Sequence, residues 1–346
     1  MIVSMRSLAE ALATGTVILD GGLSTELEAR GHDVSSALWS ARLLRDDPGA
    51  IVAAHAAFAA AGAQVATTAS YQATVEGFGA AGVDATEARR LIASSVALAR
   101  EGQGDGWVAG SVGPYGAMLA DGSEYTGAYV DALSVARLRA FHRPRMELLA
   151  EAGADVLACE TVPAAAEAEA LIAEADALGI PVWLSLTTVL DGDGVARTRR
   201  GELAADVFAM AASVDAVIAV GVNCTAPAAI GAAVAAASVA GRPVVVYPNS
   251  GESWDAVGRR WTGTPGIATD DVPPWVDGGA RLVGGCCRVR PSDIERVAMM
   301  IRRPDHKGSW LTVGGEPGPR MIRRPDHHAG QRMGLPPVTA MRAPEM

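Results

Sequence analysis

Short apolar runs alternate with longer, alanine-rich segments of helical spacing along most of the chain. The runs have the length of β-strands, and most are followed by a helical segment. Such alternation predicts parallel strands joined by right-handed crossovers. The eight predicted strands are Thr16–Leu19, Gln64–Thr68, Trp107–Val112, Val156–Cys159, Val182–Leu186, Ala216–Val222, Val244–Tyr247 and Arg281–Val283.

Eight strand–helix units in one chain favour a closed (β/α)8 barrel of the TIM type, in the α/β class. Polar and glycine-rich positions lie at the carboxyl ends of the predicted strands or just after them. In a barrel these positions share the face on which such enzymes have their active sites. A doubly wound open sheet is the alternative, but it would spread them along an edge. The positions are Asp20, Thr67, Gly113, Glu160, Cys224, Asn249 and Cys286.

The C-terminal part of the chain has a different composition. We expect residues 1–305 to form the barrel and residues 306–346, which are rich in Gly, Pro and Met, to form a poorly ordered appendage outside it. The segment Met300–His306 recurs as Met321–His327. Two copies are too few for a solenoid.

Charge and cysteine content narrow the class of function. The net charge of −10 argues against nucleic acid or an anionic membrane surface as a partner. No apolar run is long enough to span a membrane, and Met1–Glu10 has no signal-peptide core, so we expect a cytoplasmic protein. Thiols stay reduced there, so the four cysteines indicate metal binding or reactive chemistry rather than disulfides. The only lysine is Lys307, which argues against a P-loop or a lysine Schiff base in the barrel.

Three cysteines are the strongest chemical signal. Cys224 follows one predicted strand, and the adjacent Cys286 and Cys287 follow another through two glycines. A free cysteine is usually a small buried hydrophobe, which suits Cys159 but not an adjacent pair. Three thiols with one open position are typical of a catalytic zinc site. Zinc holds a bound thiol as thiolate at neutral pH, so such a site suits a substrate thiol that attacks a cationic carbon donor.

Two carboxylates and several aromatic side chains are predicted on the same face. Asp20 could be a turn or capping residue and Glu160 a solvated glutamate at a helix start. Beside the cysteines they would instead hold the ammonium of an amino-acid substrate. Trp39 and Tyr71 could be ordinary packing residues. An aromatic face would also favour an onium donor by about 0.5–2 kcal/mol.

Five stretches of the chain, four of which contain Asp20, Tyr71 or one of the three cysteines, resemble the homocysteine S-methyltransferases. The resemblance runs from about residue 14 to about residue 303. TASYQA and YPNSGE are most similar to the short branch that uses S-methylmethionine. The stretches are DGGLSTEL at 20–27, TTASYQA at 67–73, GVNC at 221–224, YPNSGE at 247–252 and GGCC at 284–287.

The resemblance implies a zinc-dependent barrel that transfers a methyl group to homocysteine and gives methionine. Cys224, Cys286 and Cys287 match the zinc ligands of the family, and no further catalytic residue is expected. Asp20 and Glu160 match the positions that hold the amino group of homocysteine.

The donor side of the site is less closely specified. Trp39 and Tyr71 match aromatic positions near the methyl donor, expected to be S-methylmethionine or S-adenosylmethionine. Longer family members have a tyrosine after the glutamate, where this chain has Thr161. Two alternatives remain open: a zinc thiol-alkyltransferase with another small thiol or selenol acceptor, and a barrel that binds without catalysing. The oligomeric state is not predicted.

Overall fold

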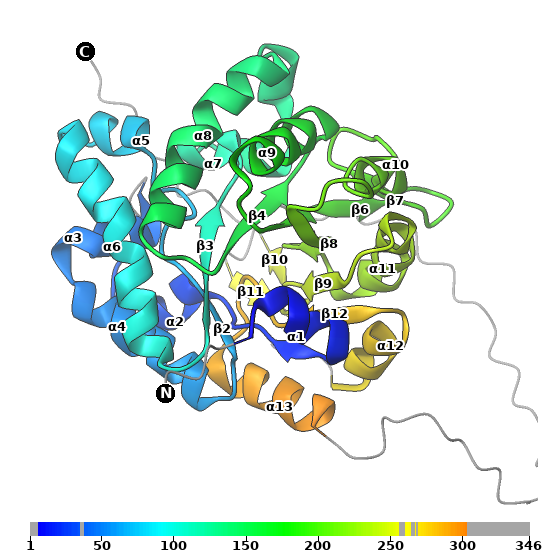
Figure 1. Ribbon diagram of the computed structural model, residues 1–346. Coiled ribbons are helices and arrows are strands. Elements are labelled where there is room, and N and C mark those ends of the chain that lie inside the picture. The colour runs from blue at the N-terminus through cyan, green and yellow to red at the C-terminus, as the bar shows by residue number, and fades with distance from the viewer. Residues whose placement is uncertain (1–5, 35–37, 256–259, 264–266, 268, 303–346) are drawn as a thin grey trace, which may run out of the picture.

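A computed structural model describes residues 6–34, 38–255, 260–263, 267 and 269–302. Within these residues, eight parallel strands form a barrel with helices around it (Figure 1). The strand order is β1-β12-β9-β8-β5-β4-β3-β2. The strands are β1 (Val17–Ile18), β2 (Val65–Thr67), β3 (Trp107–Val112), β4 (Val156–Val162), β5 (Val182–Leu186), β8 (Val217–Asn223), β9 (Val244–Tyr247) and β12 (Ala280–Val283).

The two ends of this sheet meet, so the barrel is closed. A parallel bridge joins Leu19 to Val65 next to β1 and β2. The amide of Gln64 donates to the Ile18 carbonyl at 2.7 Å, and the amide of Asp20 donates to the Val65 carbonyl at 3.2 Å. The predicted (β/α)8 barrel is therefore confirmed, and the open sheet is wrong.

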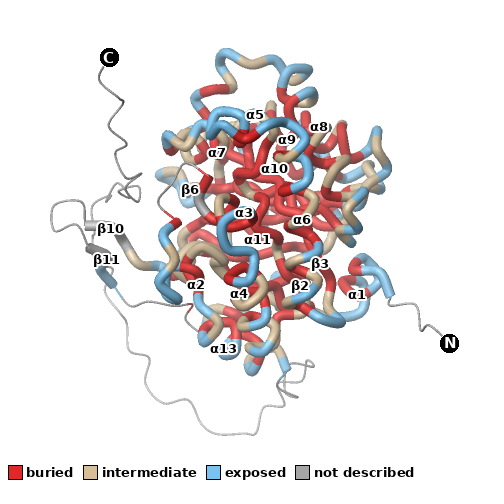
Figure 2. The backbone as a smooth tube through the Cα atoms, turned by 90° about the vertical axis from the view of Figure 1, so that its left-hand side faces the viewer, coloured by how far each residue is buried: buried red, intermediate tan, exposed pale blue. Residues whose placement is uncertain are grey.

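Helices cover the outside of the barrel, and the strands are buried on both faces (Figure 2). Every residue of β3, β4, β5 and β9 is buried. This explains why these strands are largely apolar runs rather than alternating patterns. The helices are α1 (Leu8–Thr14), α2 (Leu23–Ala29), α3 (Leu43–Asp46), α4 (Pro48–Ala60), α5 (Val75–Ala80), α6 (Ala85–Gln103), α7 (Tyr115–Leu119), α8 (Val135–Glu151), α9 (Ala165–Leu178), α10 (Ala204–Ala209), α11 (Ile230–Ala237), α12 (Val272–Asp277) and α13 (Pro291–Ile301).

Helix α1 closes one end of the barrel. Leu8 and Leu12 belong to the same buried cluster as Val17 and Trp107, which are the first residues of their strands. The helix therefore covers the amino ends of the strands and leaves the carboxyl ends for a site. Ser7 and Glu10 form a capping box at its start, a sequence signature that predicts a helix here.

The structure differs from the sequence prediction in three places. Strand β4 continues to Val162, so Glu160 lies inside the strand rather than after it. Two short strands that are not among the eight predicted ones, β6 (Thr188–Leu190) and β7 (Ala196–Thr198), form an antiparallel hairpin after β5. A second antiparallel pair, β10 (Ser253–Asp255) and β11 (Arg260–Thr262), follows β9.

The tail of the chain lies outside the described residues, from residue 303 onward. The predicted appendage at 306–346 and the second copy of the repeat therefore stay predictions. Among the described helices, none is long and apolar enough to cross a membrane.

Candidate metal and substrate site

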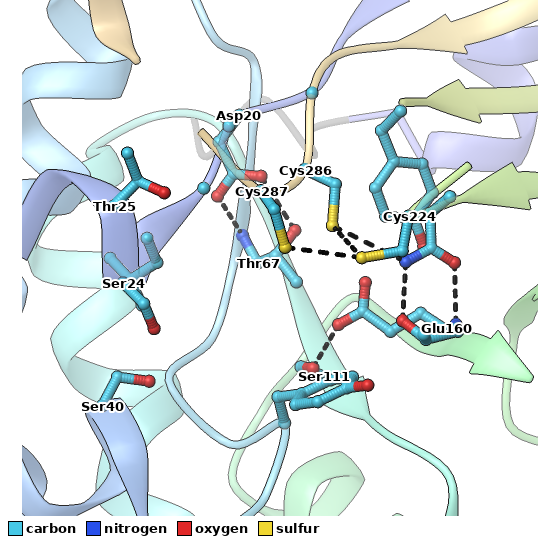
Figure 3. A pocket seen from close by; sticks show the side chains of 18 of the residues that line it. Asp20, Ser24, Thr25, Ser40, Thr67, Ser111, Glu160, Cys224, Cys286 and Cys287 are labelled. Carbon is cyan, nitrogen blue, oxygen red and sulfur yellow. Dashed lines mark hydrogen bonds between the residues drawn. The ribbon is translucent and has the colours of Figure 1, made fainter. Parts of the chain in front are cut away.

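A pocket with a cavity volume of about 130 Å³ opens at the carboxyl ends of the strands. Figure 3 shows the three sulfur atoms between the carboxylates of Asp20 and Glu160, with the hydroxyls of Ser24, Thr25 and Ser40 on the other side of the pocket. The pocket thus contains thiols, carboxylates and aromatic rings. Its lining includes Asp20, Ser24, Thr25, Ser40, Thr67, Tyr71, Gln72, Ser111, Tyr125, Glu160, Asn223, Cys224, Cys286 and Cys287.

The three cysteine sulfurs form one cluster. The Cys224 sulfur lies 3.1 Å from that of Cys286 and 3.5 Å from that of Cys287, and all three lie within 4.8 Å of one another. A tetrahedral zinc with Zn–S bonds of about 2.3 Å separates its sulfur ligands by about 3.8 Å. Hydrogen bonds with Cys224, which has the larger effect, and with Cys286 lower the pKa of the Cys287 thiol well below its ordinary value. The donor type and the spacing of the cluster fit a zinc ion.

The backbone around the cysteines explains the glycines of the GGCC stretch. A Cβ on Gly284 would lie 2.5 Å from the Asp20 carbonyl oxygen, and one on Gly285 would lie 2.1 Å from a methyl carbon of Val289. Only glycine fits such close contacts. The loop after β9 holds the same segment, because the amide of Cys286 donates to the Pro248 carbonyl at 2.7 Å.

Asp20 and Glu160 are buried carboxylates, 2% and 7% exposed. The amide and hydroxyl of Thr67 donate to Asp20 at 2.7 and 2.9 Å, and the Ser111 hydroxyl donates to Glu160. No arginine or histidine in the described chain forms an ion pair with either one. Burial raises the pKa of Asp20 to about 8 and that of Glu160 to about 7. Two carboxylates without a cation are poised to accept a cationic group from a ligand.

Asn223 connects the carboxylate side of the pocket to the thiol side. Its side-chain oxygen accepts from the Thr161 amide at 2.7 Å, and its NH₂ donates to the Thr161 hydroxyl at 2.7 Å. Thr161 has a φ of 61°, which is unfavourable for a β-branched residue. Asn223 directly precedes Cys224, so one buried amide fixes the chain next to Glu160 and next to the thiol cluster.

The structure brings together most of the residues that the sequence singles out. All three cysteines, both carboxylates and Tyr71 line the one pocket. The interpretation of Glu160 as a solvated glutamate is wrong, because it is buried inside β4. Trp39 lies in the 3₁₀ turn η1 (Trp39–Arg42), but its side chain lies outside the described part of the structure.

Sequence reasoning missed Tyr125 and the roles of Asn223 and Ser111. Tyr125 lies in the 3₁₀ turn η2 (Ser123–Tyr125), and its hydroxyl is 3.5 Å from the Cys224 sulfur. The polar loop that contains it follows a strand, which was the available signal. Ser111 lies inside β3 and could be found only once β3 and β4 were known to be neighbours.

Comparison with known proteins agrees with this geometry. A family model described as homocysteine S-methyltransferase matches residues 17–301. A homocysteine S-methyltransferase of Escherichia coli (strain K12) is 45% identical over 293 residues, covering 80% of this chain and 93% of that protein. A selenocysteine Se-methyltransferase of Brassica oleracea var. italica is 39% identical over 308 residues, covering 82% of this chain and 88% of that protein.

A solved structure shares the fold. The crystal structure of the homocysteine methyltransferase MmuM from Escherichia coli, in its metallated form, superposes with a TM-score of 0.74 at 42% sequence identity. The match covers 84% of this chain and 98% of that one. The family match, the relatives and the barrel together show that this chain belongs to the homocysteine S-methyltransferase family of enzymes.

Proposed function

We propose that this enzyme transfers a methyl group from a sulfonium donor to the thiol of homocysteine and releases methionine. The observation that supports the proposal most directly is one pocket with three convergent thiols and two buried carboxylates that lack a cation. Homocysteine has a thiol and an ammonium, and the pocket offers a matching partner for each.

Cys224, Cys286 and Cys287 are the proposed ligands of a zinc ion. Their sulfur donors suit zinc, and three protein ligands match the composition of catalytic zinc sites. Bound zinc would supply one piece of chemistry, which is to keep a substrate thiol as its thiolate at neutral pH. The relative of known structure was solved in a metallated form, which is consistent with this assignment.

Asp20 and Glu160 are proposed to bind the ammonium of homocysteine. A bound cation would restore both carboxyl groups to their ionised form, because it offsets the burial that raises their pKa. Ser111 and Thr67 would keep the two carboxylates oriented toward the pocket through their hydrogen bonds.

Methyl transfer itself requires no covalent intermediate on the protein. The homocysteine sulfur forms a bond to the methyl carbon, while the carbon–sulfur bond of the donor breaks and its electron pair stays on the departing sulfur. The donor thereby becomes a neutral thioether. The chain contributes by holding the two sulfurs and the methyl carbon in line. We propose that Tyr71, with Trp39, lines the donor side, where an aromatic face stabilises a cation.

One experiment tests the function and the metal together. Purified enzyme is assayed with homocysteine and, in turn, S-methylmethionine, S-adenosylmethionine and betaine, and zinc is measured on the same sample. We expect methionine from a sulfonium donor, about one zinc per chain, and little product from betaine. Stoichiometric zinc without product from any donor would contradict the proposal.

A second acceptor is favoured by one relative. The similar protein from Brassica oleracea is named a selenocysteine Se-methyltransferase, so a small selenol is an alternative acceptor. The same assay with selenocysteine and cysteine separates the two. A higher kcat/KM for selenocysteine than for homocysteine would favour the alternative.

A further inference from the structure

A buried arginine outside the barrel contacts the backbone of the pocket. Arg145 lies on α8 and is 3% exposed. One of its terminal nitrogens donates to the Tyr71 carbonyl at 3.1 Å, and the other donates to the Gly113 carbonyl at 2.5 Å. Tyr71 lies in the loop after β2, and Gly113 directly follows β3. One guanidinium therefore joins two neighbouring loops on the face that holds the pocket.

The fixed position of Arg145 depends on a buried chain of polar groups. An arginine can only donate, so its 3.2 Å contact with His142 makes Nδ1 of the imidazole an acceptor. The proton of a neutral imidazole is then on Nε2, which lies 2.9 Å from the Glu167 carboxylate on α9. Burial lowers the pKa of His142, which agrees with a neutral ring. The imidazole thus links a buried cation to a buried anion.

Glu167 extends this series of hydrogen-bonded groups back to the face that holds the pocket. Its carboxylate accepts from the Tyr115 amide at 2.7 Å and from the Tyr129 hydroxyl. Both partners belong to the segment between β3 and α8, which also contains Tyr125. His142 and Glu167 are completely buried, so these contacts form without competition from water.

Tyr71 is held on a second side by Gly113. A Cβ on Gly113 would lie 2.5 Å from the Tyr71 carbonyl oxygen and 2.8 Å from two carbons of its ring. The ring and carbonyl of Tyr71 therefore lie directly against the Gly113 backbone, which Arg145 also binds. Arg145 can influence where the Tyr71 ring faces the pocket without touching a substrate.

We propose that Arg145, oriented by His142 and Glu167, is a positioning residue that sets the Tyr71 ring for binding of the methyl donor. The role in donor binding rests on the proposed function, whereas the effect on the Tyr71 loop does not. Within the described residues, Arg145 forms no hydrogen bond or ion pair with Asp20 or Glu160, and its charge has only a minor effect on the pKa of Glu160. Homocysteine binding should therefore depend on Arg145 less than donor binding does.

The test compares two arginines of the same helix. Arg145→Met removes the positioning contacts, and Arg139→Met removes an ion pair of 2.6 Å with the buried Glu174 of α9, away from the pocket. For Arg145→Met we expect a rise of about 2- to 30-fold in KM for the sulfonium donor, the range that one cation–π contact spans. KM for homocysteine and the metal content stay within about twofold of wild type. Arg139→Met keeps the wild-type KM for the donor.

A double-mutant cycle separates positioning from general damage. If Arg145 acts through Tyr71, adding Arg145→Met to Tyr71→Ala raises the donor KM no further. The proposal is overturned if Arg145→Met raises the donor KM by the same factor in the wild-type and Tyr71→Ala backgrounds. It is also overturned if Arg145→Met raises KM equally for both substrates. If Arg145→Met does not fold, Arg145→Lys replaces it, because one ammonium cannot reproduce the two-pronged contact. A folded Arg145→Lys variant with wild-type donor KM also overturns it.

Hydrogen exchange gives a readout that is independent of activity. In Arg145→Met, or in Arg145→Lys, we expect faster amide exchange across residues 67–74 than in wild type or Arg139→Met. If wild type methylates no thiol at all, the proposed function fails, and exchange still decides whether Arg145 orders the Tyr71 loop. Unchanged exchange in that segment overturns the positioning role.

Discussion

Replacement of Glu160 by glutamine isolates the charge that is proposed to bind homocysteine. Glutamine keeps the size of the side chain and can still accept from the Ser111 hydroxyl, but it has no charge to offer an ammonium. A hydrogen bond to a charged group contributes about 1.5–3 kcal/mol. KM for homocysteine should therefore rise by about 10- to 150-fold. The value of kcat should change less, because the amino group is remote from the reacting sulfur and contributes uniform binding.

The assay pairs homocysteine with 4-mercaptobutanoate, which lacks the amino group. We expect Glu160→Gln to raise KM for homocysteine and leave KM for the analogue close to wild type. Glu174→Gln is the matched control, since Glu174 is also a buried carboxylate but pairs with Arg139 and Arg143 outside the pocket. An equal loss with both thiols would refute the assignment, because the lost interaction would then not involve the amino group.

The same pair of substrates gives a pH signature. Burial raises the pKa of Glu160 to about 7, so in the free enzyme this carboxyl gains its charge as the pH rises through that value. The preference for homocysteine over 4-mercaptobutanoate should grow over the same range and fall as the pH drops. Because both substrates have a thiol, its ionisation cancels in the ratio. Glu160→Gln should flatten this dependence, and a variant with the wild-type slope would contradict the reasoning.

Three further predictions concern metal, local strain and acid stability. Cys286→Ser should lose zinc and activity with an unchanged circular dichroism spectrum, whereas Cys159→Ala, outside the cluster, keeps its zinc; full zinc in Cys286→Ser would refute the ligand assignment. Asn223→Ala leaves the buried Thr161 amide without its partner, so the free energy of unfolding measured in urea should fall by about 1–3 kcal/mol. The value of kcat/KM for homocysteine should fall as well. Wild-type stability would contradict this prediction. Burial lowers the pKa of His55 to about 4, and neither ring nitrogen has a hydrogen-bond partner among the described residues. The unfolded chain therefore binds more protons between about pH 6.5 and 4, and stability falls as the pH falls through this window, by about 3 kcal/mol. His55→Leu should lose less stability than wild type over that range in denaturant unfolding, and parallel curves would exclude His55 as the cause.

The fold was predictable because short apolar strands followed by helical segments recur along the chain. Most residues of the parallel strands are buried, so each strand reads as a largely apolar run, and eight such runs define the barrel. The β6–β7 hairpin was missed because its strands are only three residues long and partly exposed. Periodicity provides little signal over so few residues.

The site was predictable only as far as residue type and strand ends determine it. Cys224, Cys286, Asp20 and Tyr71 all follow strands, and a barrel brings such positions to one face. Tyr125 lies in a long segment between β3 and α8, where the sequence does not determine which side chain turns inward. Its position results from tertiary contacts that become visible only in three dimensions.

Backbone strain provides the final link between the fold and the proposed chemistry. In the described part of the chain, four residues other than glycine have a positive φ, and three of them are at the site: Thr161, Cys224 and Arg288. Thr161 follows Glu160, which is proposed to bind the ammonium. Cys224 is a proposed zinc ligand, and Arg288 follows the proposed zinc ligand Cys287. Each such conformation costs on the order of 1–3 kcal/mol and persists only where surrounding contacts enforce it. Those contacts are present, since Asn223 binds Thr161 and Glu252 pairs with Arg288 at 2.8 Å. A scaffold that needed only to bury its core would gain stability by relaxing these positions. Their retention around the thiols and carboxylates is therefore better explained by the requirement to orient substrate groups than by packing.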